Sequence, residues 1–233
     1  MKNKNSKLSI WCNYSKLVQV WKNIGRWLKI EVKLIKSDTD VIKHIADIAS
    51  ICYGKNESQN ANKLLEKLYY NGHHSCFEHC SFTWRIDGLS RSASHQLVRH
   101  RLASYTQQSQ RYCNENQFEF VTPDSVRKNP VAFSMYIDLM KEIQNTYNKL
   151  NKLGIKKEDS RFILPNACCT SLYMTCNLRE FINICNERLC NHAQWEIREM
   201  VRKMVNTLPD NLKWMCQPKC ESGFKICNNE CRK

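Results

Sequence analysis

The chain has 233 residues, a length that suits one large domain or two small ones. Its content of 42% hydrophobic and 25% charged residues is typical of globular proteins, and the presence of only 6 glycines and 5 prolines excludes collagen-like and low-complexity chains. Two features exceed what is usual for a globular protein, namely the 14 cysteines and the formal net charge of +14. The charge indicates anionic partners, which are nucleic acid, a membrane surface or phosphorylated small molecules.

The first residues contain no apolar run of secretory length, and no window of the sequence approaches a transmembrane span. Disulfide-rich secreted domains are usually short chains that lack a core of their own. We therefore interpret the cysteines as mostly reduced thiols and expect a cytoplasmic protein without a membrane span.

Residues 1–29 differ from the rest of the chain, because they carry seven basic residues and no acidic one. Apolar residues recur among them near helical spacing, at Leu17, Val18, Trp21, Ile24, Trp27 and Leu28. Such a stretch can be a basic amphipathic helix that lies on a membrane or a partner. It can also be a poorly ordered extension or a helix packed on the body, which is the interpretation that we favour.

From residue 30 onward, hydrophobic spacing and turn residues predict a regular order of strands and helices. In chain order we expect a strand at 31–35, helices at 38–51 and 58–70, a β-rich stretch at 77–86, a helix at 89–100, a polar extended segment at 104–112, a long helix at 130–153, a short strand at 171–176, and helices at 177–189 and 193–208.

These elements, with no repeat and no interdomain linker between them, predict a single α+β domain. Asp38 is the expected cap of the first helix, and Gly154 is expected to end the long one. We divide the chain into a basic extension (1–29), one domain (30–215) and a cysteine-rich tail (216–233).

Arg99, His100 and Arg101 form the densest cluster of chemically active side chains in the sequence. Successive residues of a helix point about 100° apart, so these three can grip different parts of one anion only if the helix ends there. If the following segment is a strand, Gln107, Ser109 and Arg111 share one face. An amide, a hydroxyl and a guanidinium suit a nucleotide, although a solvated edge strand is the alternative.

Arg-His-Arg followed, after seven residues, by Ser109 is the signature spacing of the flavin-dependent thymidylate synthases, and the sequence resembles that family elsewhere too. Residues 73–79 (HHSCFEH) resemble its His-x-Ser/Thr-Pro-Phe-Glu-His segment, and 161–165 (RFILP) resemble its Arg-x-x-Leu-Pro element. Asn177-Leu178-Arg179, Asn183, Arg188 and residues 192–196 (HAQWE) match its C-terminal block. The resemblance covers about residues 30–215.

The resemblance implies the family's fold, a single mixed α/β domain with a central, largely antiparallel sheet flanked by helices. It also implies the family's reaction, the reductive methylation of dUMP to dTMP in de novo dTMP synthesis. The carbon comes from methylenetetrahydrofolate and the reducing equivalents come from NADPH through FAD. Reduced flavin delivers a hydride to the uracil, and no cysteine nucleophile is used. The resemblance also implies a homotetramer whose sites are shared between subunits.

The family's functional residues carry over onto matching positions of this sequence. The resemblance implies FAD contacts from His73, Ser75, Arg99, His100, Arg101, Gln107, Asn177, Arg179 and Asn183. It implies dUMP contacts from Gln96, Gln107, Ser109, Gln110, Arg111, Arg161 and Arg188. Arg111 and Arg161 are expected to hold the phosphate.

Arg188 and Ser109 are the candidate catalytic residues. Arg188 is always protonated, so we expect it to stabilise negative charge that develops on the uracil. Ser109 has no base among its expected strand neighbours, so we expect it to orient dUMP rather than to attack it. His192 is four residues from both Arg188 and Glu196, which predicts a supporting role on a shared helix face.

Two departures from the family pattern matter. Thr106-Gln107 stands where many family members have Asn-Glu, which removes a charge, and Cys76 replaces the usual proline, which removes a fixed φ. Two clusters contain possible metal ligands, and the cysteine-rich tail is a better candidate than the His and Cys residues of 73–80. The tail quartet consists of Cys216, Cys220, Cys227 and Cys231, and its alternatives are free thiols or two disulfides. We assign no metal ligand.

Two other functions remain as alternatives. One is a flavin- and folate-dependent methyltransferase that acts on uracil in RNA, and the other is a non-enzymatic nucleic-acid-binding protein. The basic residues of the domain fall in separate ligand-binding motifs rather than along one surface with stacking aromatics, which favours a mononucleotide over nucleic acid as the partner.

Overall fold

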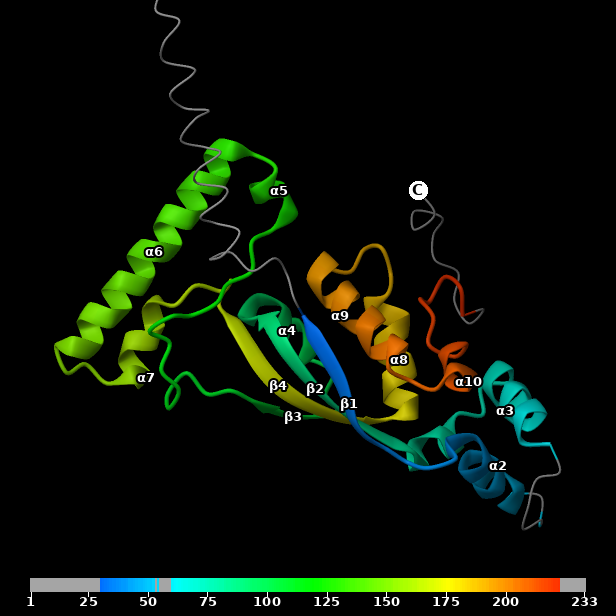
Figure 1. Ribbon diagram of the computed structural model, residues 1–233. Helices are drawn as coiled ribbons and strands as arrows, with labels where there is room; N and C mark the ends of the chain where they lie inside the picture. The colour runs from blue at the N-terminus through cyan, green and yellow to red at the C-terminus, as the bar shows by residue number, and fades with distance from the viewer. Residues whose placement is uncertain (1–29, 53, 55–59, 223–233) are drawn as a thin grey trace, which may run out of the picture. The chain divides into compact units, whose positions relative to one another are not determined.

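The computed structural model describes residues 30–52, 54 and 60–222 (Figure 1). The expected basic extension lies outside these residues, as do Cys227 and Cys231 of the tail quartet. The chain forms two compact units, of which one holds residues 30–108 with the residues from 170 onward and the other holds residues 109–169.

A four-stranded sheet is the centre of the first unit (Figure 1). Its strands are β1 (Glu31–Ser37), β2 (Ser81–Ser90), β3 (Ser104–Gln107) and β4 (Cys169–Asn177), in the order β1-β2-β4-β3. β1 pairs antiparallel with β2, and β3 pairs antiparallel with β4. The expected α+β class with a largely antiparallel sheet is therefore confirmed.

One face of this sheet is buried by two helices, α8 (Leu178–Arg188) and α9 (Trp195–Asn206) (Figure 1). Alternate residues of β2, such as Phe82 and Trp84, are fully buried. The ring of Trp84 stacks on Phe181 of α8 with 4.7 Å between the ring centroids. These contacts fix the start of α8 against the sheet, and α8 carries much of the expected C-terminal motif.

The remaining helices of the first unit are short and bring the expected site segments together. They are α2 (Val41–Ile51), α3 (Ala61–Tyr70), the 3-10 helix η1 (Ser75–His79), α4 (Arg91–Leu97) and α10 (Asp210–Lys213). The backbone amide of Leu178 donates to the carbonyl of Cys80, with 2.9 Å between them. The expected FAD segment around η1 is thereby fixed beside the start of α8.

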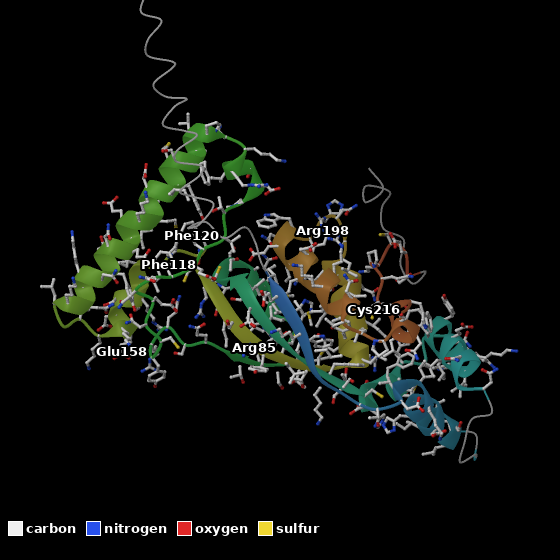
Figure 2. All side chains as sticks on the ribbon, in the orientation of Figure 1. Arg85, Phe118, Phe120, Glu158, Arg198 and Cys216 are labelled. Carbon is white, nitrogen blue, oxygen red and sulfur yellow. The ribbon has the colours of Figure 1, made fainter. Side chains whose placement is uncertain are left out.

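The second unit consists of α5 (Asp124–Arg127), the long α6 (Pro130–Lys152), α7 (Lys157–Ser160) and the 3-10 helix η2 (Arg161–Ile163). Its core contains Phe118, Met140 and Cys168. Phe120 packs edge-on against Tyr136 of α6, and Figure 2 labels both phenylalanines beside this helix.

Several expected elements differ from the structure at their ends. The expected helix 89–100 is reduced to α4, because β2 runs on to Ser90, whose hydroxyl then caps α4 by accepting from the amide of Ala93. The cap of α2 is Asp40, whereas the carboxylate of Asp38 accepts from the amide of Ser81. The first part of the expected β-rich stretch 77–86 is η1, and the short helix α10 was not anticipated.

The polar segment 104–112 is the largest difference, because its strand ends at Gln107. The carbonyl of Ser109 accepts from the amides of Tyr112 and Cys113, and the Ser109 hydroxyl accepts from the amide of Arg111. A serine side chain that bonds to a nearby amide gives the backbone an alternative to the sheet ladder. The expected common face of Gln107, Ser109 and Arg111 is therefore wrong.

Candidate active site

The Arg-His-Arg segment lies in a turn directly after α4, as its expected role requires. α4 ends at Leu97, and the amide of His100 donates to the Leu97 carbonyl over 3.1 Å. Arg99 and Arg101 are exposed, whereas His100 is only 7% exposed. The two guanidiniums are available to an anionic ligand while the imidazole turns inward.

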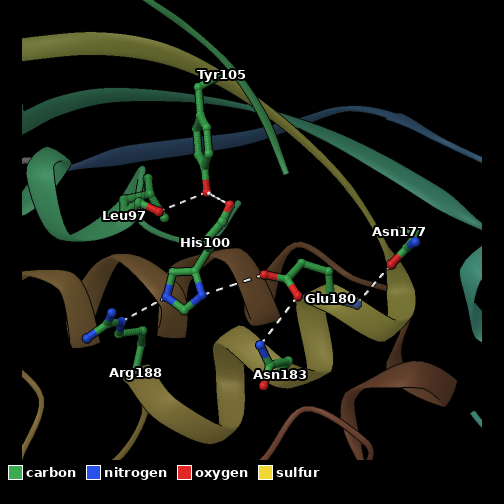
Figure 3. Close-up of polar contacts among 7 residues, drawn as sticks. All are labelled: Leu97, His100, Tyr105, Asn177, Glu180, Asn183 and Arg188. Atoms are coloured by element: carbon green, nitrogen blue, oxygen red, sulfur yellow. Dashed lines mark hydrogen bonds and ion pairs between the residues drawn. The ribbon is translucent and has the colours of Figure 1, made fainter. Parts of the chain in front are cut away.

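Tyr105 of β3 stabilises this turn through its hydroxyl group. Its hydroxyl donates to the carbonyl of Leu97 over 2.8 Å and also lies 3.2 Å from the carbonyl of His100 (Figure 3). Burial, and then the thiol of Cys176 and the carboxyl group of Glu180, raise the pKa of the Tyr105 phenol. Tyr105 therefore stays a neutral donor.

Both ring nitrogens of His100 face side chains of α8 (Figure 3). The Nε of Arg188 donates to His100 Nε2 over 2.9 Å. His100 Nδ1 lies 3.6 Å from Oε1 of Glu180, which is only 4% exposed. Burial and the charge of Arg188 lower the pKa of His100, and burial is the main cause of the raised pKa of Glu180.

The asparagines expected at FAD also organise α8. Asn177 caps the helix, since its Oδ1 accepts from the amide of Glu180 over 2.9 Å. Asn183 Nδ2 donates to Glu180 Oε2 over 3.3 Å. Glu180 therefore connects both asparagines to His100, a link that the sequence prediction missed.

A pocket of about 620 Å³ opens beside the start of α8. It is lined by His74, Glu78, Leu102, Asn177, Arg179, Glu180, Ile182, Asn183 and Asn186. Three of the expected FAD residues line it, and Arg179 forms an ion pair across to Glu78 of η1. Its size is in the range of ligand pockets in proteins, and its exposed guanidinium suits a phosphate.

The other expected residues of the first unit lie near these elements. His73 and Ser75 are exposed where η1 begins, and Gln96 is half-buried in the last turn of α4. Cys76, which replaces the family proline, is buried, and its thiol donates to the carbonyl of His73 over 3.5 Å. A side-chain contact thus holds this loop where a proline ring would restrict it.

Gln107 is fixed by two hydroxyls. Its Nε2 donates to Ser94 Oγ over 3.0 Å and to Thr170 Oγ1 over 3.2 Å, while the Ser94 hydroxyl itself donates to the carbonyl of Arg91. A glutamate in this place could only accept, so Ser94 would have to give up its bond to Arg91. The amide therefore matches the hydroxyls around it.

In the second unit, the two arginines expected at the dUMP phosphate meet at Glu158. Arg111 forms an ion pair with the Glu158 carboxylate, with 2.9 Å between Nη2 and Oε2. The Nε of Arg161 donates to the Glu158 backbone carbonyl over 3.1 Å. Both arginines therefore contact the same residue, and a phosphate can compete with the Glu158 carboxylate for Arg111.

Gln110 and His192 show how tertiary contacts redirect side chains. The amide of Gln110 donates to the thiol of buried Cys168 over 3.6 Å. α8 ends at Arg188 and α9 begins at Trp195, so the expected helix face shared by Arg188, His192 and Glu196 is wrong. His192 is exposed in the connecting loop, and Glu196 bonds to Ser90.

Among residues 30–52, 54 and 60–222, no three or more His, Cys, Asp or Glu side chains are grouped so that they could hold a metal ion. The cysteines that the structure describes are all free thiols. No helix within these same ranges is long and apolar enough to cross a membrane.

Comparisons with known proteins place the chain in a family. A family model described as "Thymidylate synthase complementing protein" matches residues 33–211. A flavin-dependent thymidylate synthase of Clostridium tetani is 36% identical over 227 residues, which are 85% of this chain and 91% of that protein. One of Thermococcus onnurineus is 45% identical over 151 residues, 63% of this chain and 62% of that protein.

A solved structure shares the fold. It is a UMP/dUMP methylase from Streptomyces cacaoi bound with 5-Br dUMP, which is 22% identical and superposes with a TM-score of 0.72. The superposition covers 80% of this chain and 94% of the other. The residues that the family match covers include η1, the Arg-His-Arg turn and α8. This chain belongs to the flavin-dependent thymidylate synthase family.

Proposed function

We propose that this protein converts dUMP to dTMP in the cytoplasm, with FAD as cofactor, methylenetetrahydrofolate as carbon donor and NADPH as reductant. The observation that carries the proposal is the bond between His100 and Arg188. These residues come from two separate family motifs, and the imidazole of His100 also faces Glu180, which lines the pocket at the start of α8 (Figure 3).

The residues of this pocket fit a dinucleotide cofactor. Arg179 is an exposed cation of the pocket that suits the pyrophosphate, and Asn177 and Asn183 line the pocket with amide groups. Arg99 and Arg101 are further exposed cations in the turn that precedes Leu102 of the same pocket. In its reduced state, bound FAD supplies the hydride for the uracil ring, so the chain needs no cysteine nucleophile.

The chain's own residues then hold dUMP and stabilise charge. Arg111 and Arg161 bind the phosphate, while Gln96, Gln107 and Gln110 contribute amide contacts to the nucleotide. Arg188 keeps its terminal nitrogens on the side away from the imidazole (Figure 3), and these donate to the uracil oxygen on which negative charge develops.

We propose that the active form is a homotetramer with shared sites. Val131, Met135 and Leu139 follow one face of α6 and are each more than half exposed, at 69%, 69% and 51%. An apolar stripe of this kind on a long helix is usually covered by another helix. Light scattering that shows an active monomer would contradict the shared sites.

The test of the proposed function starts from the full chain purified with FAD. We expect flavin absorbance, tritium release from dUMP labelled at C5, and NADPH oxidation that depends on dUMP and methylenetetrahydrofolate. Methylation of a uridine oligonucleotide supplied in place of dUMP would instead favour the alternative enzyme that acts on uracil in RNA. A colourless protein that cannot be reconstituted with FAD, yet binds oligonucleotides, would refute the proposal.

Arg111→Ala is expected to raise the KM for dUMP by roughly 10- to 100-fold, because a hydrogen bond to a charged group contributes about 1.5–3 kcal/mol. kcat at saturating dUMP should change little, since the phosphate is remote from the reacting carbon. Steady-state kinetics check both values. Arg127→Ala is the control, because Arg127 also pairs with a carboxylate, that of Asp124, in the same unit. An unchanged KM in Arg111→Ala would remove this residue from the phosphate site.

Ser109→Ala is expected to raise the KM for dUMP by roughly 3- to 10-fold, the effect of losing one neutral hydrogen bond, and to leave turnover measurable. Within the part of the chain that the structure describes, its Oγ accepts from the backbone amide of Arg111, which is not a base. Ser134→Ala on α6 is the matched control. If Ser109→Ala abolishes the chemistry while dUMP and FAD still bind, Ser109 acts as a nucleophile.

A further inference from the structure

Glu180 is a buried carboxyl group to which no part of the proposed reaction has assigned a role. It is 4% exposed and lies on α8 between the two asparagines that contact it. On its other side lies His100, which is 7% exposed and accepts a hydrogen bond from the Nε of Arg188 (Figure 3). Glu180, His100 and Arg188 thus form a row of polar groups that runs from the protein interior to the proposed uracil site.

The directions of the bonds in this row determine where the imidazole proton lies. A guanidinium can only donate, so His100 Nε2 must accept from Arg188 and carry no hydrogen. The proton of the neutral ring is then on Nδ1, which faces Glu180 Oε1 at 3.6 Å. Glu180 therefore favours the one tautomer that can hold Arg188.

Glu180 is itself held in place by α8. Its backbone amide donates to Asn177 Oδ1, and its Oε2 accepts from Asn183 Nδ2. With its backbone held by the cap and Oε2 held by Asn183, the carboxyl group can orient the ring through Oε1, and the ring can orient the guanidinium that it accepts from. Burial of a carboxyl group costs free energy. A buried carboxyl group is therefore expected to have a role other than packing.

Protonation of His100 would break the row. A second ring proton would point at the Nε–H of Arg188 and bring two cations into contact. The titratable or charged groups that face this site are Glu180, Glu187 and Arg188 from α8, and Tyr105 from β3, with Cys176 of β4 beside Tyr105 and Glu180. Burial and Arg188 lower the pKa of His100, whereas Glu187 opposes this shift.

We infer that Glu180 is a positioning residue that acts through His100 to hold Arg188 in its productive orientation. The inference rests on the proposed function, because Arg188 is the group that faces the uracil there. Glu180 touches neither substrate nor reacting atoms in this role.

The variant that tests the inference is Glu180→Gln, which keeps the shape and removes the carboxylate. The amide can donate to Nδ1 and so favours the tautomer with its proton on Nε2, which Arg188 cannot use. We expect kcat to fall by roughly 10- to 100-fold, the loss typical of a catalytic group displaced by up to about 1 Å. With FAD at saturating concentration, the KM for dUMP should stay within about twofold of wild type, because the substitution leaves the expected dUMP contacts unchanged.

A double-mutant cycle with Arg188→Ala separates positioning from a merely structural role. If Glu180 acts only through Arg188, Glu180→Gln should lower single-turnover flavin oxidation by less than about twofold when Arg188 is already absent. Glu199→Gln on α9 is the control for loss of a carboxylate, because Glu199 pairs with Arg202 on the surface. An undiminished effect in the Arg188→Ala background, or a fully active Glu180→Gln enzyme, would overturn the inference.

His100→Gln keeps the inference testable if Glu180→Gln does not fold. The amide oxygen can still accept from Arg188 but does not titrate. Wild-type kcat should be retained at high pH and fall as the pH drops through the lowered pKa of His100, whereas this acid limb should be absent from His100→Gln. An acid limb that remains in the variant would overturn the inference. A wild-type protein that does not methylate dUMP would instead refute the proposed function, so the two failures are distinguishable.

Discussion

Arg188→Ala should lower kcat for dTMP formation by roughly 100- to 1,000-fold, the loss measured when one donor to a developing oxyanion is removed. Arg188 ends α8 with its Nε fixed by His100 at 2.9 Å, so its terminal nitrogens are preorganised for charge on the uracil. Preorganised donors contribute most to the rate because they need no reorientation as charge forms. The expected change in the KM for dUMP is much smaller.

The measurement is single-turnover oxidation of reduced flavin in the presence of dUMP and methylenetetrahydrofolate. Arg202→Ala is the matched control, since Arg202 is a surface arginine on the next helix whose side chain is 56% exposed. Thermal unfolding of both variants confirms that they fold. If Arg188→Ala raised KM and left kcat intact, Arg188 would bind the ground state and the transition state equally, and its proposed role would be wrong.

Glu196→Ala should lower the free energy of unfolding by roughly 2–5 kcal/mol, because each buried polar group left without a partner costs about 1–3 kcal/mol. Glu196 is 2% exposed, and its two oxygens accept from the backbone amide and the hydroxyl of Ser90, each over 2.6 Å. Ser90 in turn caps α4, which leads into the Arg-His-Arg turn. The expected loss is a large share of the 5–15 kcal/mol that stabilises a typical protein.

Urea unfolding gives the measurement, with a lower midpoint and an unchanged slope as the expected result. Glu199→Ala, one turn further along α9, is the control and should stay within about 0.5 kcal/mol of wild type, as surface substitutions do. A Glu196→Ala protein as stable as the control would show that Ser90 finds other partners.

Local signals in the sequence predicted the long helices well. α6 runs from Pro130 to Lys152, close to the expected 130–153, because Asn129 caps its start and Gly154, at a φ of 84°, follows its end. α8 begins after Asn177, as expected, for the same kind of reason. Caps and stops act within a few residues, so they are readable without the fold.

Contacts between distant segments could not be predicted in this way. Glu180 stands three residues after the cap Asn177, which is the spacing of a capping box, yet its side chain turns to His100 on another element. Gln107, Ser109 and Arg111 alternate as in a strand, but β3 has ended by Ser109 because a local serine bond replaces the ladder. Spacing alone does not indicate which of two such partners a polar group takes.

The sequence by itself determined the family, the α+β class and the set of residues at which flavin and nucleotide are expected, because these depend on motifs and on local periodicity. The family comparison confirms the first, and the sheet confirms the second. Only the tertiary structure decided that Glu180 completes the contacts of His100 and Arg188, and that Glu196 secures Ser90 rather than His192. The physical reason is that a hydrogen bond needs its two groups within about 3.2 Å, and for residues far apart in the chain only the packing of helices on the sheet sets that distance.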